Sequence, residues 1–446
     1  MSTKDKFAYA LIHAKMKKGT FDARIVYVLL DGVGDLPHID LNNSTPLDAA
    51  HTPNMDELAQ NGCMGETITV KEGLAPQSDI AVFNMLGYSF QNNDYVGRGV
   101  IESIGCEIDF RNGDLALRGN FATIDDQSRI IDRRAGRTIA SAEADSVCRT
   151  LTEQLKFSDS EISFVIKPTI AHRLIVRFRH KSKSFSDKIT NTDPAYLKMN
   201  GIGIVNPAAG VVHLAESQPE DSTQAALISA KTINEFSDQA KNILKFHPVN
   251  AQRKNAGMPT MNAILLRDAG NKLPEIEPIK KKYNLETAAV VDMPVEIGIS
   301  RILGMRVLKT SDTSDYKSKA MIVAKNLNQT GCVYIHLKGP DEFGHDGDPL
   351  GKKKSIEDID KFFFGPLRDG LTPDTDSLII ISADHSTPCV KRAHSADPVP
   401  VLFSGNMVKK DGSKRFTEKY GSIGSLGRLK GSNVLKVALE RLNQSN

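Results

Sequence analysis

The chain has 446 residues, a formal net charge of +3, 40% hydrophobic residues and 25% charged residues. This length exceeds what one core comfortably serves, so two domains are expected, and the near-neutral charge argues against a nucleic-acid binder. No apolar run reaches the ~18 residues that a membrane span needs, so we predict a cytoplasmic protein without membrane partners. The five cysteines are odd in number and form no CxxC pair, which argues against a disulfide framework and a thiolate zinc site.

The first predicted element is a buried strand in "RIVYVLLDG", where residues 25–30 are apolar on both faces and Asp31 follows. The next is a helix in "LAPQSDIAVFNMLGY", where Ser78 precedes apolar residues at helical spacing. Taken alone, Ser78 is more readily explained as the N-cap of this helix. The alternative is a nucleophile, because backbone N–H groups and the positive end of a helix dipole would hold a phosphoryl group there.

The middle of the chain has a different pattern, with short strand-like pieces "LALRGNFATID", "EISFVIKP" and "HRLIVRFRH" and helices near 139–156 and 222–247. We interpret residues 112–262 as a smaller α+β domain, inserted into an α/β domain formed by residues 1–111 and 263–446. Strands predicted from Cys332 and Ser377, with helices near 355–369 and at the end of the chain, complete the larger domain. Alternating strands and helices predict a doubly wound, mostly parallel sheet, in which ligands collect beyond the carboxyl ends of the strands.

Acidic and imidazole side chains follow the predicted strand ends. Each of these residues alone could be an ordinary turn or solvated residue, but their occurrence at the ends of several strands favours a metal site. Three carboxylates and three imidazoles, with Ser78 completing one set of ligands, suffice for two divalent ions such as Mn²⁺, Zn²⁺, Co²⁺ or Mg²⁺. A bound cation would also activate the Ser78 hydroxyl for phosphoryl transfer. The candidate ligands are Asp31, Asp341, His345, Asp384, His385 and His394.

The motifs "VLLDG", "PQSD", "LLGY", "YVGRG", "KGPDEFGHDGD", "SADHSTP" and "HSADPVPV" occur in an order that resembles the archaeal-type, cofactor-independent phosphoglycerate mutases of the alkaline phosphatase superfamily. The resemblance runs over nearly the whole chain after about residue 20 and implies an alkaline-phosphatase-like sheet. It implies a glycolytic and gluconeogenic isomerase, a 2,3-bisphosphoglycerate-independent phosphoglycerate mutase, that interconverts 3-phosphoglycerate and 2-phosphoglycerate without bisphosphoglycerate. Phosphorylated Ser78 would be the intermediate.

The resemblance also implies roles for single residues. One metal ion would be held by Asp31, Ser78, Asp384 and His385, and the other by Asp341, His345 and His394, with Mn²⁺ preferred. The inserted domain would grip the carboxylate and phosphate of the substrate, and Lys338 would lie near the phosphate. The candidate substrate-binding residues are Arg133, Arg134, Arg137, His172, Arg173, Asp193, Arg267 and Lys338.

Two departures from the family pattern affect binding details: Gln77 where glycine is frequent, and "RDAG" at 267–270 where "RGAG" is more usual. The first rival hypothesis is a metal-dependent phosphatase, or a mutase for another phosphorylated metabolite. The second is a noncatalytic sensor of phosphorylated metabolites. The sequence leaves open whether the chain forms a homo-oligomer, and it assigns no role to the first 20 residues.

Overall fold

The computed structural model describes residues 24–90, 95–199, 202–205, 212–310, 312–371 and 377–444, so the first 20 residues lie outside the described part. The chain divides into two compact units. The first comprises Met1–Ser89, Glu277–Asp292 and Leu303–Asn446, and the second comprises Phe90–Ile276 and Met293–Ile302. The predicted domain boundaries at 112 and 262 fall inside the second unit.

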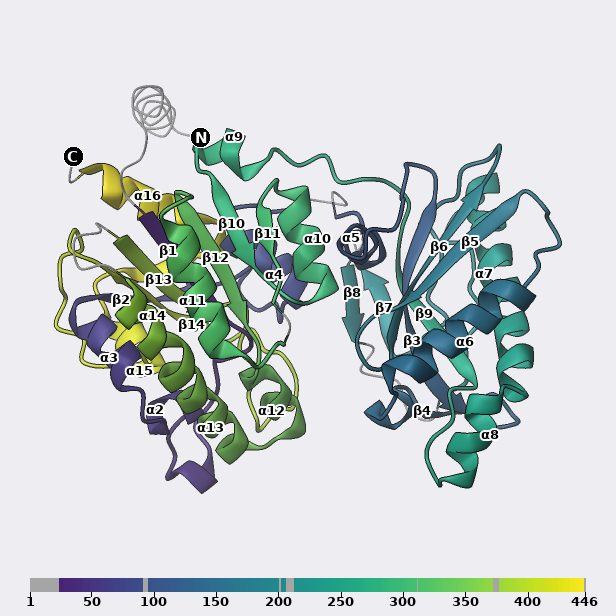
Figure 1. The fold of residues 1–446 in the computed structure, drawn as a ribbon, viewed down its shortest axis with the longest axis horizontal. Coiled ribbons are helices and arrows are strands. Elements are labelled where there is room, and N and C mark those ends of the chain that lie inside the picture. Colours follow the sequence, from purple (N-terminus) through teal and green to yellow (C-terminus); the bar gives the residue numbers. More distant parts are fainter. Residues whose placement is uncertain are drawn as a thin grey trace. The chain divides into compact units, whose positions relative to one another are not determined.

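The first unit contains an eight-stranded sheet, in which β1 lies between β12 and β13 (Figure 1). Strand β14 runs antiparallel to both of its neighbours, and the other pairs are parallel. The predicted doubly wound, mostly parallel sheet is therefore confirmed. In sheet order the strands are β11 (Arg306–Leu308), β10 (Thr287–Val290), β12 (Cys332–Leu337), β1 (Arg24–Leu30), β13 (Ser377–Ala383), β14 (Val399–Ser404), β2 (Gly62–Ile68) and β15 (Gly427–Lys430).

Every residue of β1 from Ile25 to Leu30 is fully buried, because helices cover both faces of this sheet. Alternate residues Val26, Val28 and Leu30 belong to the main core with α11 and α13, whereas the Tyr27 hydroxyl on the opposite face donates to the carbonyl of Met85 in α4. The helical elements of this unit are η1 (Ile39–Leu41), α2 (Pro46–Ala49), α3 (Pro53–Gln60), α4 (Ser78–Met85), α9 (Ile279–Tyr283), α11 (Tyr316–Leu327), α12 (Pro340–Asp346), α13 (Pro349–Ile359), η3 (Asp360–Phe364), α14 (Gly365–Gly370), α15 (Glu418–Ile423), η4 (Gly431–Asn433) and α16 (Val434–Gln444).

The second unit is built on an antiparallel sheet of five strands, in which β3 pairs with β4, β6 and β9. Because β9 pairs with β3, and α5 packs against both strands and against α10, these elements join the second unit and extend it past the predicted boundaries. The strands are β3 (Leu115–Ile124), β4 (Ile130–Asp132), β5 (Ile162–Pro168), β6 (Arg173–His180) and β9 (Ala263–Gly270), with a hairpin of β7 (Tyr196–Met199) and β8 (Ile202–Val205). The helices are α5 (Arg98–Gly105), η2 (Ala135–Arg137), α6 (Ser141–Gln154), α7 (Gln224–Lys245), α8 (Pro248–Asn255) and α10 (Pro294–Ile302).

Strand alternation divides the sheet of the second unit into an apolar face and a polar face. Leu115, Leu117 and Phe121 of β3 join a core with residues of α6 and α7. Residues of opposite parity point to the other face, where α5 packs against β3. The polar face therefore receives side chains at every second position of β3, β6 and β9.

Candidate active site

The carboxyl ends of three neighbouring strands bring the predicted acidic residues together. Leu30 at the end of β1 is in register with Leu337 of β12 and Ala383 of β13. Asp31 therefore lies beside the residues that follow those strands, including Asp384 and His385. Asp384 and His385 lie just past the end of β13, as predicted from their adjacency in the sequence. Asp341 and His345, four residues apart, share the short helix α12.

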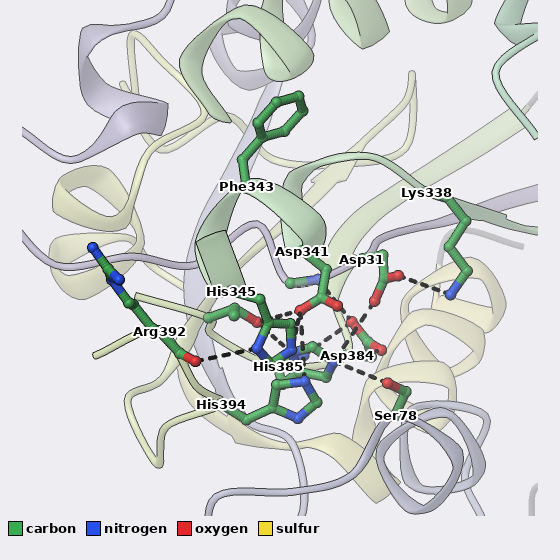
Figure 2. A network of polar contacts seen from close by, with 12 residues as sticks. Asp31, Ser78, Lys338, Asp341, Phe343, His345, Asp384, His385, Arg392 and His394 are labelled. Carbon is green, nitrogen blue, oxygen red and sulfur yellow. Dashed lines mark hydrogen bonds and ion pairs between the residues drawn. The ribbon is translucent and has the colours of Figure 1, made fainter. Parts of the chain in front are cut away.

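The six predicted ligands form two clusters of three side chains (Figure 2). In each cluster, one ligand atom from each residue lies within 4.8 Å of the others. The first cluster comprises Asp31, Asp384 and His385, all buried, and the second comprises Asp341, His345 and His394. The clusters adjoin, because the rings of His385 and His394 stack with centroids 3.6 Å apart.

Ser78 lies at the first cluster and does not act as a cap. Helix α4 begins at Ser78, and its N-cap is Gln77, whose side chain makes no capping hydrogen bond. The Ser78 hydroxyl oxygen lies 3.0 Å from His385 Nε2. The sequence-based N-cap interpretation of Ser78 is therefore wrong, because its hydroxyl faces the cluster and the N-cap position falls on the residue before it.

Two histidines of the second cluster are held with Nε2 toward Asp341. His394 Nδ1 lies 2.7 Å from the carbonyl oxygen of Pro76, and His345 Nδ1 lies 3.2 Å from that of Arg392. Because a carbonyl only accepts, each Nδ1 must carry the proton and donate it. Nε2 of His394 and His345 lie 3.5 Å and 3.6 Å from Asp341 Oδ1. With Nδ1 committed to a carbonyl, Nε2 is in each ring the nitrogen that faces the cluster and would serve as a metal ligand.

Three close carboxylates make this region strongly anionic. Burial raises the pKa of Asp31, and the nearby Asp384 carboxylate raises it further. The Lys338 ammonium donates to Asp31 Oδ2 at 2.8 Å and opposes this rise. Burial lowers the pKa of His394, but the Asp341 carboxylate outweighs it and raises that pKa to about 9. Asp31 Oδ1 is buried without a hydrogen-bond partner among the described residues, and Asp384 Oδ2 faces His385 Nε2 at 3.2 Å. A buried carboxylate oxygen without a hydrogen-bond partner fits a bound cation.

In the second unit, an arginine cluster occupies the polar face of the sheet. Arg118 of β3 is paired directly with Arg267 of β9, and Asn120 of β3 is paired with Arg173 of β6. Arg118 and Arg267 are only 5% and 6% exposed. Burial, then Arg173 and Arg118, lower the pKa of His172 to about 3, so this ring is neutral within the cluster. The arrangement gathers Arg267, His172 and Arg173 among the predicted substrate-binding residues.

Other predicted substrate-binding residues have distinct positions. Asp193 is fully buried and forms an ion pair with Arg133, so its carboxylate orients that guanidinium. Arg137 contributes to the low pKa of His172, which puts it near the cluster. Arg134 is exposed, and its backbone makes the hydrogen bonds: its N–H donates to Asp132 and its carbonyl accepts from the N–H of Arg137. These contacts do not bring the Arg134 side chain to the cluster.

Sequence reasoning missed three members of this cluster. Arg118 pairs with Glu102 of α5, and the Arg267 guanidinium carbon lies 3.6 Å from the centroid of the Tyr196 ring. Burial opposes ionisation of Glu102, but Arg118 and Arg98 lower its pKa below the ordinary value. The signal for Arg118 was present, since it interrupts the apolar strand "LALRGNFATID". Glu102 lies in an ordinary helix sequence and Tyr196 begins the short strand β7, so neither carries such a signal.

The cluster has unused hydrogen-bond donors suited to an anion. Nitrogen atoms of three of its arginines are buried without a hydrogen-bond partner in the described part of the chain: Arg118 Nε, Arg133 Nη1 and Arg267 Nε. Arginine binds carboxylate and phosphate oxygens through paired N–H groups. The polar face is therefore chemically suited to a ligand that carries such groups.

Both departures from the family pattern are accommodated by the backbone. Gln77 has φ −83° and ψ 148°, an extended conformation open to any residue. Asp268 has φ 58°, in the left-handed region where glycine is unstrained, and aspartate is among the side chains that tolerate it best. The glycine that is more usual at position 268 thus has a conformational reason.

Comparisons with known proteins give a consistent result. Residues 59–250 match the model of a family described as 2,3-bisphosphoglycerate-independent phosphoglycerate mutase. A protein of that name from Aeropyrum pernix is 39% identical over 92% of this chain and 96% of its own, and one from Methanopyrus kandleri is 34% identical over 95% and 97%. A solved cofactor-independent phosphoglycerate mutase from Thermoplasma acidophilum is 30% identical, with TM-score 0.61 over 94% of this chain and 99% of its own.

A solved Pyrococcus horikoshii protein is 28% identical, with TM-score 0.75 over 96% of this chain and 99% of its own.

None of the helices in the described part of the chain is both long and apolar enough to cross a lipid bilayer. Each cysteine is a free thiol, and four of the five are buried, as expected for structural residues.

Proposed function

The chain belongs to the 2,3-bisphosphoglycerate-independent phosphoglycerate mutase family, as its motifs predicted, and on this premise we propose that it interconverts 3-phosphoglycerate and 2-phosphoglycerate through a phosphoserine at Ser78. The observation that carries the proposal is the Ser78 hydroxyl 3.0 Å from His385 Nε2, at the first residue of α4 and beside two clusters of carboxylates and imidazoles.

We propose that these clusters hold two divalent ions, with Mn²⁺ preferred and Mg²⁺, Co²⁺ or Zn²⁺ as alternatives. Carboxylate oxygens and imidazole nitrogens are the ligands that these ions take. Asp31, Asp384, His385 and Ser78 would hold one ion, and Asp341, His345 and His394 the other. When bound, the ions would lower the pKa of the serine hydroxyl and neutralise charge on the phosphoryl oxygens.

The residues of this chain then perform a balanced exchange. Ser78 Oγ gives up its proton and attacks phosphorus, and the bond between phosphorus and the glycerate oxygen breaks as that oxygen takes up a proton. The other glycerate hydroxyl next gives up its proton and attacks the phosphoserine, whose bond to Ser78 Oγ breaks as that oxygen regains a proton. The N–H groups at the start of α4 would stabilise the transferring group, and Lys338 adds a positive charge beside Asp31. Retention of glycerate between the two steps separates a mutase from a phosphatase.

We propose that the arginine cluster of the second unit recognises the anionic groups of the substrate. Phosphoglycerate carries a carboxylate and a phosphate, and both match the paired N–H groups of arginine. The buried nitrogens without partners on Arg118, Arg133 and Arg267, among the residues that the structure describes, support this role. Arg134 is the weakest of the predicted contacts: it and Arg137 are both exposed, but only Arg137 contributes to the low pKa of His172.

The test is a product analysis by phosphorus NMR, with purified protein, 3-phosphoglycerate and Mn²⁺ but no bisphosphoglycerate. The proposal expects 2-phosphoglycerate at its equilibrium share with little free phosphate. Inorganic phosphate as the main product would instead identify a phosphatase, and unchanged 3-phosphoglycerate would refute the substrate.

Ser78→Ala should lower kcat by about 10³-fold or more, because the nucleophile is lost. The matched control is Thr223→Ala, which removes the true N-cap hydroxyl of α7. This control should cost about 1 kcal/mol of stability and leave turnover unchanged. Full turnover by the Ser78→Ala protein would exclude the phosphoserine.

A further inference from the structure

A threonine outside both proposed sets of ligands connects them. Thr387 is fully buried, two residues after His385. Its hydroxyl oxygen lies 2.6 Å from Asp341 Oδ1, in the second cluster, and 3.0 Å from His385 Nδ1, in the first. A single hydroxyl thus contacts one residue of each cluster.

The hydrogen-bond roles at this hydroxyl follow from elimination. The Thr387 hydroxyl donates its single proton to Asp341 Oδ1, because a carboxylate oxygen accepts. The hydroxyl oxygen can then only accept from His385, which requires the proton of that ring on Nδ1. Nε2 of His385, the atom that faces Ser78 and Asp384, is then the nitrogen available to a metal ion.

The Thr387 backbone is held as firmly as its side chain. Its N–H donates to the carbonyl of Gly34 at 3.0 Å, and its own carbonyl accepts from the buried Lys352 ammonium at 2.9 Å. Close neighbours also confine it, since a Cβ at Gly344 would lie 2.3 Å from the Thr387 carbonyl oxygen, and one at Gly32 would lie 2.7 Å from its hydroxyl. The hydroxyl is thus presented in one position.

We propose that Thr387 is a positioning residue that sets the tautomer of His385 and couples the two metal clusters through Asp341. This inference rests on the proposed metal-dependent function. Carbonyl groups fix the tautomers of His345 and His394, so His385 alone among the three depends on a side chain that mutation can remove. Loss of a hydrogen-bond partner behind a ligand typically lowers metal affinity by about 10–100-fold.

The test compares Thr387→Val, which replaces the hydroxyl by a methyl group of similar size, with Thr387→Ser, which keeps the hydroxyl. Mn²⁺ affinity and stoichiometry are measured by calorimetry on the purified full chain. We expect Thr387→Val to bind Mn²⁺ about 10–100-fold more weakly and Thr387→Ser to bind close to wild type. The matched control is Thr67→Val, since Thr67 is also fully buried but its hydroxyl has no partner in the described part of the chain.

A second readout needs no metal. Nitrogen-15 NMR of histidine-labelled, metal-free protein reports the tautomer, and the His385 signal is identified by its loss in the His385→Gln variant. Thr387→Val should reduce the Nδ1–H tautomer of His385. Wild-type Mn²⁺ affinity in Thr387→Val, or equal weakening in Thr387→Ser, would overturn the inference. A wild-type chain that binds no Mn²⁺ would instead refute the proposed function itself.

Discussion

The buried ion pair of Lys352 and Asp35, next to the two clusters of carboxylates and imidazoles, supplies a stringent test of the fold. Lys352 and Asp35 have fully buried side chains whose charged atoms lie 2.8 Å apart. The ammonium also donates to the carbonyls of Gly34 and Thr387, at 3.0 and 2.9 Å, so all three of its protons are used. Lys352→Met keeps the side-chain length and removes the charge, which leaves Asp35 buried without its counter-ion.

Removing one partner of a buried ion pair costs about 3–5 kcal/mol. For a unit of this size, 1 kcal/mol corresponds to about 2–4 °C in Tm, so Tm should fall by about 6–20 °C. The assay is urea and thermal unfolding of metal-free protein followed by circular dichroism, because the chain has no tryptophan. The metal-free state separates this effect from any change in metal affinity.

Two further variants sharpen the result. Lys353→Met, on the next residue of α13, removes a partly exposed pair with Glu357 and should cost no more than about 1 kcal/mol. Adding Asp35→Asn to Lys352→Met should recover part of the loss, because the unpaired buried charge is gone. If Lys352→Met costs as little as Lys353→Met, the assignment of a strongly coupled buried pair is refuted.

Three other predictions concern separate parts of the molecule. Burial raises the pKa of Glu418 from 4.5 to about 7. The protonated Glu418 side chain therefore contributes fully to stability below pH 4.5, and this contribution is lost as the pH rises through 7. The Tm difference between wild type and Glu418→Gln should fall over that range. Arg118→Met should raise KM for 3-phosphoglycerate about 10–100-fold, because a buried charged donor of the arginine cluster is lost, while Mn²⁺ affinity stays unchanged. Arg253→Met should raise KM and speed amide exchange at residues 135–137, where its guanidinium donates to the Ala135 carbonyl at 3.1 Å.

Each of these predictions has a result that contradicts it. A Tm difference independent of pH would show that Glu418 titrates normally. An unchanged KM in Arg118→Met would remove that residue from substrate recognition. For Arg253, the reasoning fails if exchange at residues 135–137 is unaltered. These residues have φ of 43°, 75° and 56°, so an unsupported loop should relax.

Much of the site could be predicted from the sequence, and the reason is the architecture of parallel sheets. Buried strands appear as continuous apolar runs, and their ends are marked by the first polar residue, as at Asp31 and Asp384. Parallel strands bring such ends to one edge, so these two residues could be grouped despite their wide separation along the chain. The spacing of Asp341 and His345 likewise predicted one turn of helix, which is α12.

Other features depended on contacts that no local pattern encodes. The N-cap interpretation of Ser78 could be excluded only because α4 begins at that residue, with its hydroxyl beside His385. The extent of the second unit was set by the pairing of β9 with β3.

The sequence by itself determined the family, the sheet and the carboxylates and imidazoles at the edge of that sheet, because those depend on residue identity and periodicity. Only the tertiary structure decided which donors face each other, since that depends on strand register. Arg118 opposite Arg267, and one threonine hydroxyl between Asp341 and His385, are products of that register and of chain packing.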